Sequence, residues 1–153
     1  MLKIITLPNP ILRQKAKKIA DVMDPKIQKL IPQMTELMLK EGVGLAAPQI
    51  GESIRLIVVK YKDGSVAMIN PRILKKSILK EWGEEGCLSV PGKYGEVKRS
   101  KKLTIRYTDE KGKAKTLNAQ GMLARIIQHE TDHLDGVLFI DKARKIVELN
   151  PNE

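Results

Sequence analysis

Apolar residues recur at helical spacing in two stretches of the chain, and the first of them follows Asp24. Asp24 is a plausible N-cap, and Pro25 suits the first helical position, where its missing N–H would have no partner. Apolar positions three or four residues apart then predict a helix: Ile27, Leu30, Ile31, Met34, Leu37 and Met38. Pro32 lies inside this pattern and predicts a kink or a late helix start. The small-residue stretch 42–51 should end the helix, and taken alone it is typical of a C-cap followed by a tight loop.

The second helical stretch lies near the C-terminus, between Asn118 as a plausible N-cap and Gly136 as a stop. Two neighbouring stripes run along it at spacings of three and four residues. The first stripe contains Met122, Ile126, His129 and His133, and the second contains Leu123, Ile127, Glu130 and Leu134. The two histidines continue an apolar face, so we expect their imidazoles to point into the protein, where they need polar partners.

Strand patterns fill the middle of the chain and are separated by turn signals rather than by helices. Asp63-Gly64 is a hairpin signal, and Asn70-Pro71 should end the returning strand. The stronger strand candidates are 56–59, 66–69, 103–108 and 114–117, and the weaker ones are 73–74 and 78–79. Strands joined by turns favour antiparallel sheets. We therefore expect an α+β fold with mostly antiparallel sheets packed around a central helix that carries both histidines, an N-terminal helix and, over 141–149, at most a short C-terminal helix.

Composition limits the architecture and the setting. At 153 residues the chain should form a single domain over 1–153, with an aliphatic core because aromatics make up only 3%. No apolar run approaches the roughly 20 residues of a membrane span, and the start of the chain is too short and broken for a signal-peptide core. We expect a cytoplasmic protein with no membrane partner.

The net charge of +10 has two interpretations. One is a well-solvated surface, and the other is proximity to a polyanion such as RNA. The lysine-rich runs are not interleaved with aromatic residues, so they offer no platform for base stacking and we expect no sequence-specific nucleic-acid binding. These runs are 15–18, 75–80, 98–102 and 111–115.

The strongest chemical signal is His129-Glu130-Thr131-Asp132-His133. Two imidazoles at i and i+4 lie on one helix face and can bind a single divalent metal ion. Glu130 follows the first histidine and can act as a general base without binding the metal. Two core histidines with ordinary hydrogen bonds are the alternative, which the complete HExxH motif disfavours.

A catalytic site of this kind commonly has three protein ligands and an open position for water. The single cysteine, Cys87, lies in a stretch flanked by Gly86 and Pro91 that we expect to be a loop, from which a thiolate could reach the histidine helix. A buried, inert thiol is the alternative for Cys87. Carboxylates downstream of the histidines are further candidates for the third ligand: Asp135, Asp141, Glu148 and Glu153.

Three segments together resemble the peptide deformylase family. They are GVGLAAPQ at residues 42–49, EGCLS at 85–89 and QHETDHL at 128–134, and PILR at 10–13 is similar to the family's opening. The resemblance covers most of the chain. It implies a hydrolase that removes the formyl group from N-formylmethionine of newly made bacterial or organellar polypeptides and releases formate.

The resemblance also implies roles for individual residues. Cys87, His129 and His133 would hold the metal, and Glu130 would be the general acid/base. Gln49 and the backbone N–H of Leu88 would stabilise the oxyanion, and Gly44 would contact the substrate backbone. The metal would be Fe(II) in the cell for many members, with zinc, nickel or cobalt as substitutes, and the substrate would be the N-formylmethionyl end of a nascent chain near the ribosome.

Further roles are hypotheses from position. Val43, Met122 and Ile126 could line a pocket for the methionine side chain. Glu85 and Arg99 could pair behind Cys87, and Asp132 could orient a ligand histidine, with a solvent-facing aspartate as the alternative.

Two other classes of function remain open. A zinc peptidase would use a carboxylate as third ligand and would keep its metal in Cys87→Ser. A non-enzymatic, RNA-associated module with a structural metal would bind RNA in a salt-sensitive way and would be indifferent to Glu130→Gln.

Overall fold

The computed structural model describes residues 2–149. Outside the described residues lie Met1 and 150–153. The candidate ligand Glu153 and both ends of the expected domain fall in this part of the chain. Two α-helices are described, α1 (Pro25–Glu41) and α2 (Gly121–Leu134), together with short 3₁₀ turns at Pro10–Arg13, Ala47–Ile50 and Phe139–Asp141. The strands are β1 (Gly44–Ala46), β2 (Leu56–Tyr61), β3 (Gly64–Lys76), β4 (Lys80–Cys87), β5 (Val90–Ser100), β6 (Lys102–Thr108), β7 (Ala114–Gln120) and β8 (Arg144–Glu148).

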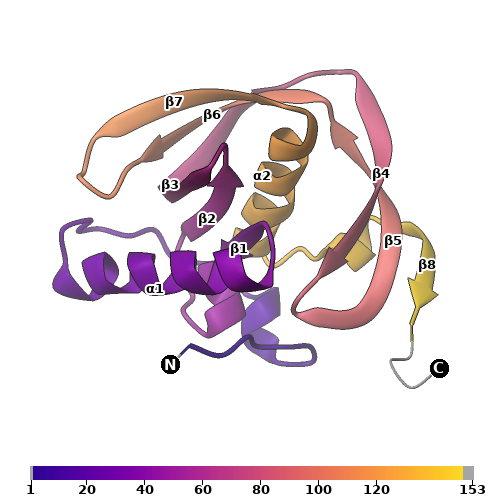
Figure 1. Cartoon of the computed structure of the whole chain (residues 1–153), viewed down its shortest axis with the longest axis horizontal. Helices are drawn as coiled ribbons and strands as arrows, with labels where there is room; N and C mark the ends of the chain where they lie inside the picture. Colours follow the sequence, from indigo (N-terminus) through magenta and orange to yellow (C-terminus); the bar gives the residue numbers. More distant parts are fainter. Residues whose placement is uncertain (1, 150–153) are drawn as a thin grey trace.

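The strands form two sheets, ordered β1-β2-β3-β6-β7 and β4-β5-β8. Every pair of neighbouring strands is antiparallel. The expected α+β class with mostly antiparallel sheets is therefore confirmed. Helix α2 lies between the two sheets, and α1 lies across β1 and β2 (Figure 1). Neither described α-helix is long and apolar enough to cross a membrane.

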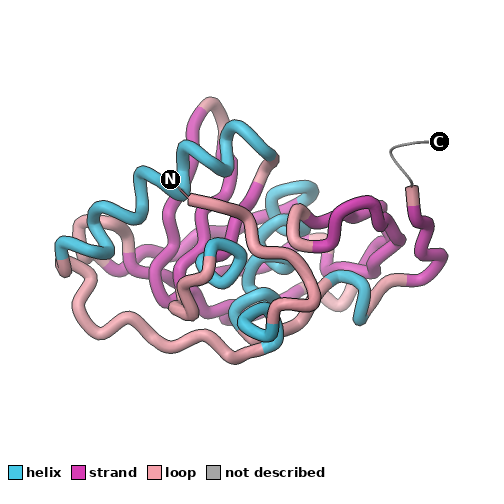
Figure 2. The backbone as a smooth tube through the Cα atoms, turned by 90° about the horizontal axis from the view of Figure 1, so that it is seen from below, coloured by secondary structure: helices cyan, strands magenta, loops and turns pink. Residues whose placement is uncertain are grey.

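Strand β2 explains how the larger sheet is covered on both faces. Its first four residues are all fully buried. Ile57 and Val59 join the cluster that packs against α2, whereas Leu56 and Val58 join the cluster that packs against α1. Because successive side chains point to opposite faces of a strand, β2 contributes to two separate hydrophobic cores. The segment before α1 runs over the surface mainly as loop (Figure 2).

Helix α1 begins where its sequence predicts. The Asp24 side chain accepts a hydrogen bond from the Lys26 N–H at 2.9 Å, and Pro25 takes the first helical position. The expected late start at Pro32 is wrong, because the helix runs through it. Pro32 is exposed while Ile31 and Met34 on either side are buried, so burial of the apolar face offsets the lost backbone hydrogen bond.

The expected start of α2 is also wrong. Asn118 lies in β7 and its side chain accepts a hydrogen bond from the Thr104 hydroxyl at 2.8 Å, so strand pairing with β6 continues to Gln120 before the helix begins. The stop at Gly136 is confirmed, since its φ of +74° breaks the helix. A Cβ atom at Gly136 would lie 2.5 Å from the Arg13 carbonyl oxygen, so the close approach of the N-terminal segment also requires glycine.

Strand β3 does not end at Asn70-Pro71 as expected but continues to Lys76. A register shift between Ile69 and Arg72 accommodates the proline, and Asn70 adopts a φ of +50° there. The weak strand candidate 73–74 lies inside β3, whereas 78–79 lies in the connection to β4 and is exposed.

The hairpin of β4 and β5 replaces the loop expected around Cys87. Cys87 ends β4, and Leu88 and Ser89 form the turn to β5. Strand β4 contains two glycines and three glutamates, which have low strand propensity, so its sequence does not look like a strand. The C-terminal segment, where at most a short helix was expected, forms a 3₁₀ turn and then β8, which pairs with β5.

Candidate active site

Three side chains with metal-binding atoms converge where β4 ends against α2. The Cys87 Sγ lies 3.3 Å from the His133 Nε2, and one donor atom each from Cys87, His129 and His133 lie within 4.8 Å of one another. The Nδ1 of His129 is engaged by Glu85, which leaves its Nε2 for this cluster. One sulfur and two nitrogens suit zinc, iron, nickel or cobalt, so the residues present fit a divalent transition metal.

The carboxylates proposed as alternative third ligands lie elsewhere. Asp135 pairs with Arg55 at 3.0 Å, and Asp141 pairs with Arg13 at 2.6 Å. Glu148 belongs to the exposed strand β8. In the part of the chain that the structure describes, the only cluster of three potential metal ligands is the one that contains Cys87, which disfavours a peptidase-type site.

Glu85 forms the centre of a buried ionic network behind this cluster. Its Oε1 lies 2.8 Å from the His129 Nδ1, and both of its oxygens accept hydrogen bonds from Arg99 at 2.9 Å. Arg125 donates to the Glu85 Oε2 at 2.7 Å. Arg99 also donates to Asp132 at 2.6 Å, so Asp132 reaches His129 only through Arg99 and Glu85.

The network keeps Glu85 ionised. Burial raises the pKa of Glu85, but hydrogen bonds and charge from Arg99 and His129 outweigh this and hold that pKa well below its usual value. Burial lowers the pKa of Arg99, and its bonds to Glu85 and Asp132 raise it, with a net increase. A carboxylate fixed in its charged form holds the His129 ring in one orientation.

The two imidazoles experience different fields. Burial lowers the pKa of His129, but the charge of Glu130 and hydrogen bonds with Cys87 and Glu85 raise it to about 10. Burial and the nearby positive charge of His129 lower the pKa of His133 well below its usual value. A metal-ligating imidazole must be neutral, so binding of a divalent ion would have to displace a proton from His129.

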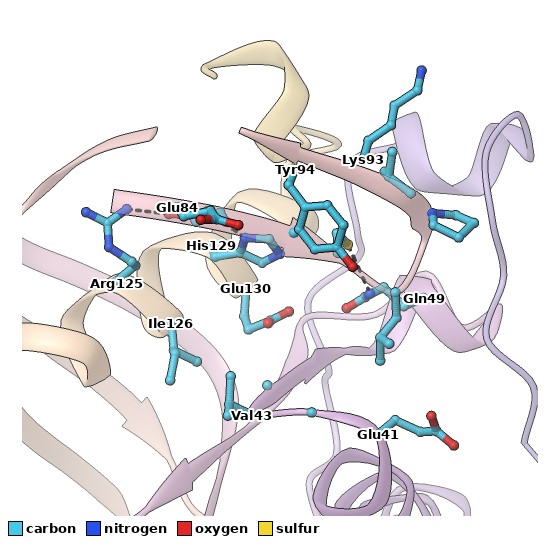
Figure 3. Close-up of a pocket in the computed structure, with 18 of the residues that line it drawn as sticks. Glu41, Val43, Gln49, Glu84, Lys93, Tyr94, Arg125, Ile126, His129 and Glu130 are labelled. Atoms are coloured by element: carbon cyan, nitrogen blue, oxygen red, sulfur yellow. Dashed lines mark hydrogen bonds and ion pairs between the residues drawn. The ribbon is translucent and has the colours of Figure 1, made fainter. Parts of the chain in front are cut away.

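Glu130 follows His129 on α2 and faces the cavity beside the cluster (Figure 3). It is 4% exposed, and its Oε1 is buried without a hydrogen-bond partner among residues 2–149. Burial raises the pKa of this carboxyl to about 7, partly opposed by the charge of His129. A Cβ atom at Gly44 would lie 2.5 Å from the Glu130 Oε2, so the glycine makes room for the carboxylate.

Gln49 lies across the cavity from Glu130 (Figure 3). Its Oε1 accepts a hydrogen bond from the Ala46 N–H at 3.0 Å, which sets the amide's orientation. Its Nε2 then points at the Ser89 hydroxyl, 3.2 Å away, and at the Cys87 Sγ, 3.5 Å away. Leu88, in the turn after Cys87, lines the same cavity.

The cavity has a volume of about 480 Å³ and brings together nearly all the predicted site residues. Val43, Gly44, Met122 and Ile126 line it, and their proposed contacts with the substrate stay a prediction. His133, Arg99 and Asp132 are not among the lining residues. Lining residues that sequence reasoning missed are Glu41, Glu84, Lys93, Tyr94 and Arg125. Arg125 could have been found from its position four residues before His129, but Tyr94 depends on the unrecognised strand β5.

Comparisons with known proteins agree with this geometry. A family model described as polypeptide deformylase matches residues 1–148. Peptide deformylase from Dictyoglomus thermophilum is 48% identical over 136 residues, which cover 88% of this chain and 88% of that protein. Peptide deformylase 1 from Bacillus cereus is 46% identical and covers 100% of this chain and 99% of its own length.

Solved structures of peptide deformylases are similar to this chain as well. The crystal structure of peptide deformylase from Thermotoga maritima matches with a TM-score of 0.90 at 42% identity, covering 94% of this chain and 98% of that chain. The structure from Synechococcus elongatus in complex with actinonin matches with a TM-score of 0.89 at 41% identity, covering 94% and 79%. The chain therefore belongs to the polypeptide deformylase family, metal-dependent hydrolases that remove the N-formyl group from newly synthesised polypeptides.

Proposed function

We propose that residues 1–153 act as one catalytic domain that hydrolyses the formyl amide of N-formylmethionyl polypeptides, with a divalent metal held by Cys87, His129 and His133. The observation that carries the proposal is the placement of three donor atoms within 4.8 Å of one another beside a buried carboxylate whose Oε1 has no partner. Helix α2 is then the central metal-binding helix of the fold.

We propose Fe(II) as the natural metal, with zinc, nickel or cobalt as substitutes. The donor set is compatible with each of these ions, and the resemblance to the family favours iron. When bound, such an ion lowers the pKa of water and polarises the formyl carbonyl. Glu85 supports the site by fixing the ring of His129, and Arg99 and Asp132 support Glu85.

Glu130 carries the proton transfers. Its unpartnered Oε1 accepts the proton of the attacking water, and the oxygen of that water adds to the formyl carbon. The carboxyl then delivers the proton to the amine nitrogen as the C–N bond breaks. Formate and a free amino terminus are released.

Gln49 and Leu88 stabilise the negative charge that develops on the formyl oxygen. The Gln49 amide is held by the Ala46 N–H, so its Nε2 is already oriented toward the Cys87 side of the cavity. The backbone N–H of Leu88 supplies a second donor from the turn. One fixed donor of this kind contributes about 3–4 kcal/mol in the transition state.

The apolar part of the cavity receives the methionine side chain. Val43, Met122 and Ile126 line it next to Glu130. Gly44 belongs to β1, an edge strand that pairs only with β2, so the free edge of β1 can hydrogen-bond an extended substrate backbone. We place this activity in the bacterial cytoplasm or an organelle, close to the ribosome where formylated chains emerge.

The test is formate release from a formyl-Met-Ala-Ser peptide by protein reconstituted anaerobically with Fe(II) or Ni(II). We expect metal-dependent release that is lost in Glu130→Gln while metal content is unchanged. Metal retention in Cys87→Ser, together with peptide-bond cleavage, would contradict the deformylase assignment and support a peptidase. Folded, metal-loaded protein that releases no formate would contradict any hydrolytic role on this substrate.

A further inference from the structure

The strands β3, β6 and β7 carry basic residues and no acidic ones. Within these strands the sequence contains six Lys or Arg and no Asp or Glu. One surface of β6 and β7 packs on α2 through the cluster that includes Leu103, Ile105 and Ala119. Helix α1 lies across β1 and β2, so the other surface of β6 and β7 is left without a covering helix (Figure 1).

Strand register places four cations on that uncovered surface. Arg72 lies opposite Arg106, Lys75 lies opposite Thr104, and residues directly opposite each other project to the same side of a sheet. Lys102 and Arg106 flank Thr104 at intervals of two residues, so they share its side. All four side chains are exposed. We refer to Arg72, Lys75, Lys102 and Arg106 as the basic sheet face.

The charges on this face are uncompensated. No ion pair in the described range 2–149 involves any of the four. Arg72 and Arg106 are direct cross-strand neighbours, with Cβ atoms about 5 Å apart, where like charges are destabilising. The fold thus keeps a repulsion that a bound polyanion would relieve.

The face also presents neutral hydrogen-bonding groups beside its cations. A hollow of about 690 Å³ at one end is lined by Lys75 and Lys102 together with Thr104, Asn118 and Gln120. Hydroxyl and amide groups among lysines are typical donors to phosphate and ribose oxygens. The substrate cavity, in contrast, is lined by Glu41, Glu84, Glu85 and Glu130. That cavity also contains Lys93 and Arg125, so its lining is of mixed charge, whereas the basic sheet face carries cations alone.

We infer that the basic sheet face binds double-helical RNA through its phosphates, independently of peptide hydrolysis. The face has no exposed aromatic side chain for base stacking, because Tyr107 points to the core, so single strands gain little there. An RNA duplex is recognised through its backbone and its 2′-hydroxyls, which is what these side chains can contact. An anionic membrane would require several apolar groups among the cations. Between Arg72 and Lys75 only the half-exposed Leu74 is available, and the exposed Ile78 and Leu79 lie beyond the end of the face.

The test compares two variants of the metal-loaded protein that lose the same charge. The first replaces the four residues of the face by Gln. The matched control replaces Lys3, Lys15, Lys18 and Lys29 by Gln, all exposed and distant in sequence from the face. Binding of a fluorescent RNA hairpin is measured by anisotropy between 50 and 200 mM salt. We expect the face variant to bind at least tenfold more weakly, with a salt slope smaller by about three, because each lost phosphate contact removes about 0.7–0.9 from it.

The outcomes separate the explanations. The control should bind RNA within threefold of the original protein, and both variants should release formate from formyl-Met-Ala-Ser at the original rate. Equal weakening of both variants would show that net charge alone acts and would overturn the inference. Tighter binding to vesicles containing phosphatidylserine than to the RNA duplex would also overturn the inference. The same conclusion would follow if the original protein bound no RNA at 50 mM salt.

Discussion

Replacing Gly44 by Ala should disable the proton transfer by Glu130 while leaving the metal site assembled. The added Cβ would lie 2.5 Å from the Glu130 Oε2, 3.0 Å from the Glu130 Cγ and 2.8 Å from the Ile126 Cγ2. Non-bonded carbon and oxygen atoms do not come this close, so the side chains of Glu130 and Ile126 would have to shift. Glu130 is 4% exposed, so its carboxylate cannot swing into solvent and must move within the cavity.

The magnitude follows from the role proposed for the carboxylate. General acid–base catalysis by a positioned group contributes about 10²–10⁴ in rate. A displacement of the Oε2 by about 1 Å removes part of this, and we expect kcat to fall roughly 30- to 300-fold, which corresponds to about 2–3.4 kcal/mol in the activation free energy. Overpacking beside Ile126 should lower the free energy of unfolding by about 1–3 kcal/mol.

The same cavity offers a matched control. Gly42 is also a lining residue, but a Cβ atom there would meet nothing within 4 Å, so Gly42→Ala should keep kcat within a factor of two. Both variants are assayed for formate release, metal content and urea denaturation. Metal content should stay at one ion per chain in each, since Cys87, His129 and His133 are untouched. Full kcat in a folded Gly44→Ala protein would refute the proposed position and role of Glu130.

Three further variants test stability by urea or thermal denaturation. Glu85→Gln should cost about 3–5 kcal/mol, because it leaves Arg125 buried without its anion and Arg99 with Asp132 alone, and its metal retention should fall; an unchanged stability would contradict the importance of the network. The pKa of Glu85 is lower in the folded protein than its usual 4.5, so its contribution is present above about pH 4.5 and is lost as the pH falls toward the folded-state pKa; the acid limb of stability should be flatter in Glu85→Gln. Arg106→Glu should raise the free energy of unfolding by about 0.2–1 kcal/mol, because it converts the repulsion with Arg72 into an attraction, and a lower melting temperature would argue against the register described. Gly136→Ala should destabilise by roughly 2 kcal/mol, because it forces Ala into a φ of +74° against the Arg13 carbonyl, whereas an unaffected midpoint would show that the N-terminal segment is not held there.

The parts of the fold that could be predicted from sequence are those with strong local signals. Asp24-Pro25 carries its own capping chemistry, and the β2–β3 hairpin was recognised from Asp63-Gly64 between apolar runs. The histidine pair could be placed together because two residues four apart on a helix are neighbours whatever the rest of the chain does. In each case a few adjacent residues decide the geometry.

The features that sequence patterns did not predict, the extension of β7 and the bulge in β3, depend on partners far away in the chain. Asn118 suits a helix cap, yet its neighbours complete seven paired positions with β6, and the strand extends three residues further than Leu117. Asn70-Pro71 suits a strand end, yet Asn70 bonds the backbone of Ile19 through both polar atoms of its amide, and this holds a bulge in place of a stop. Such partners are 14 to 51 residues away in the chain, so no local pattern contains them.

The hairpin of β4 and β5 shows most clearly why local propensity fails near the site. Gly83 and Gly86 make β4 look like a loop, but a Cβ atom at Gly83 would lie 2.6 Å from the Arg125 guanidinium carbon, and one at Gly86 would lie 2.8 Å from the Tyr94 ring. Together with Gly44, these glycines leave space for three cavity-lining side chains, those of Arg125, Tyr94 and Glu130. The strand accepts a poor intrinsic propensity because a side chain from another element occupies each gap. At Gly44, Gly83 and Gly86 the glycine inside a strand therefore marks the place where a cavity-lining side chain approaches the backbone, whereas Gly95 in β5 makes room for Ala143.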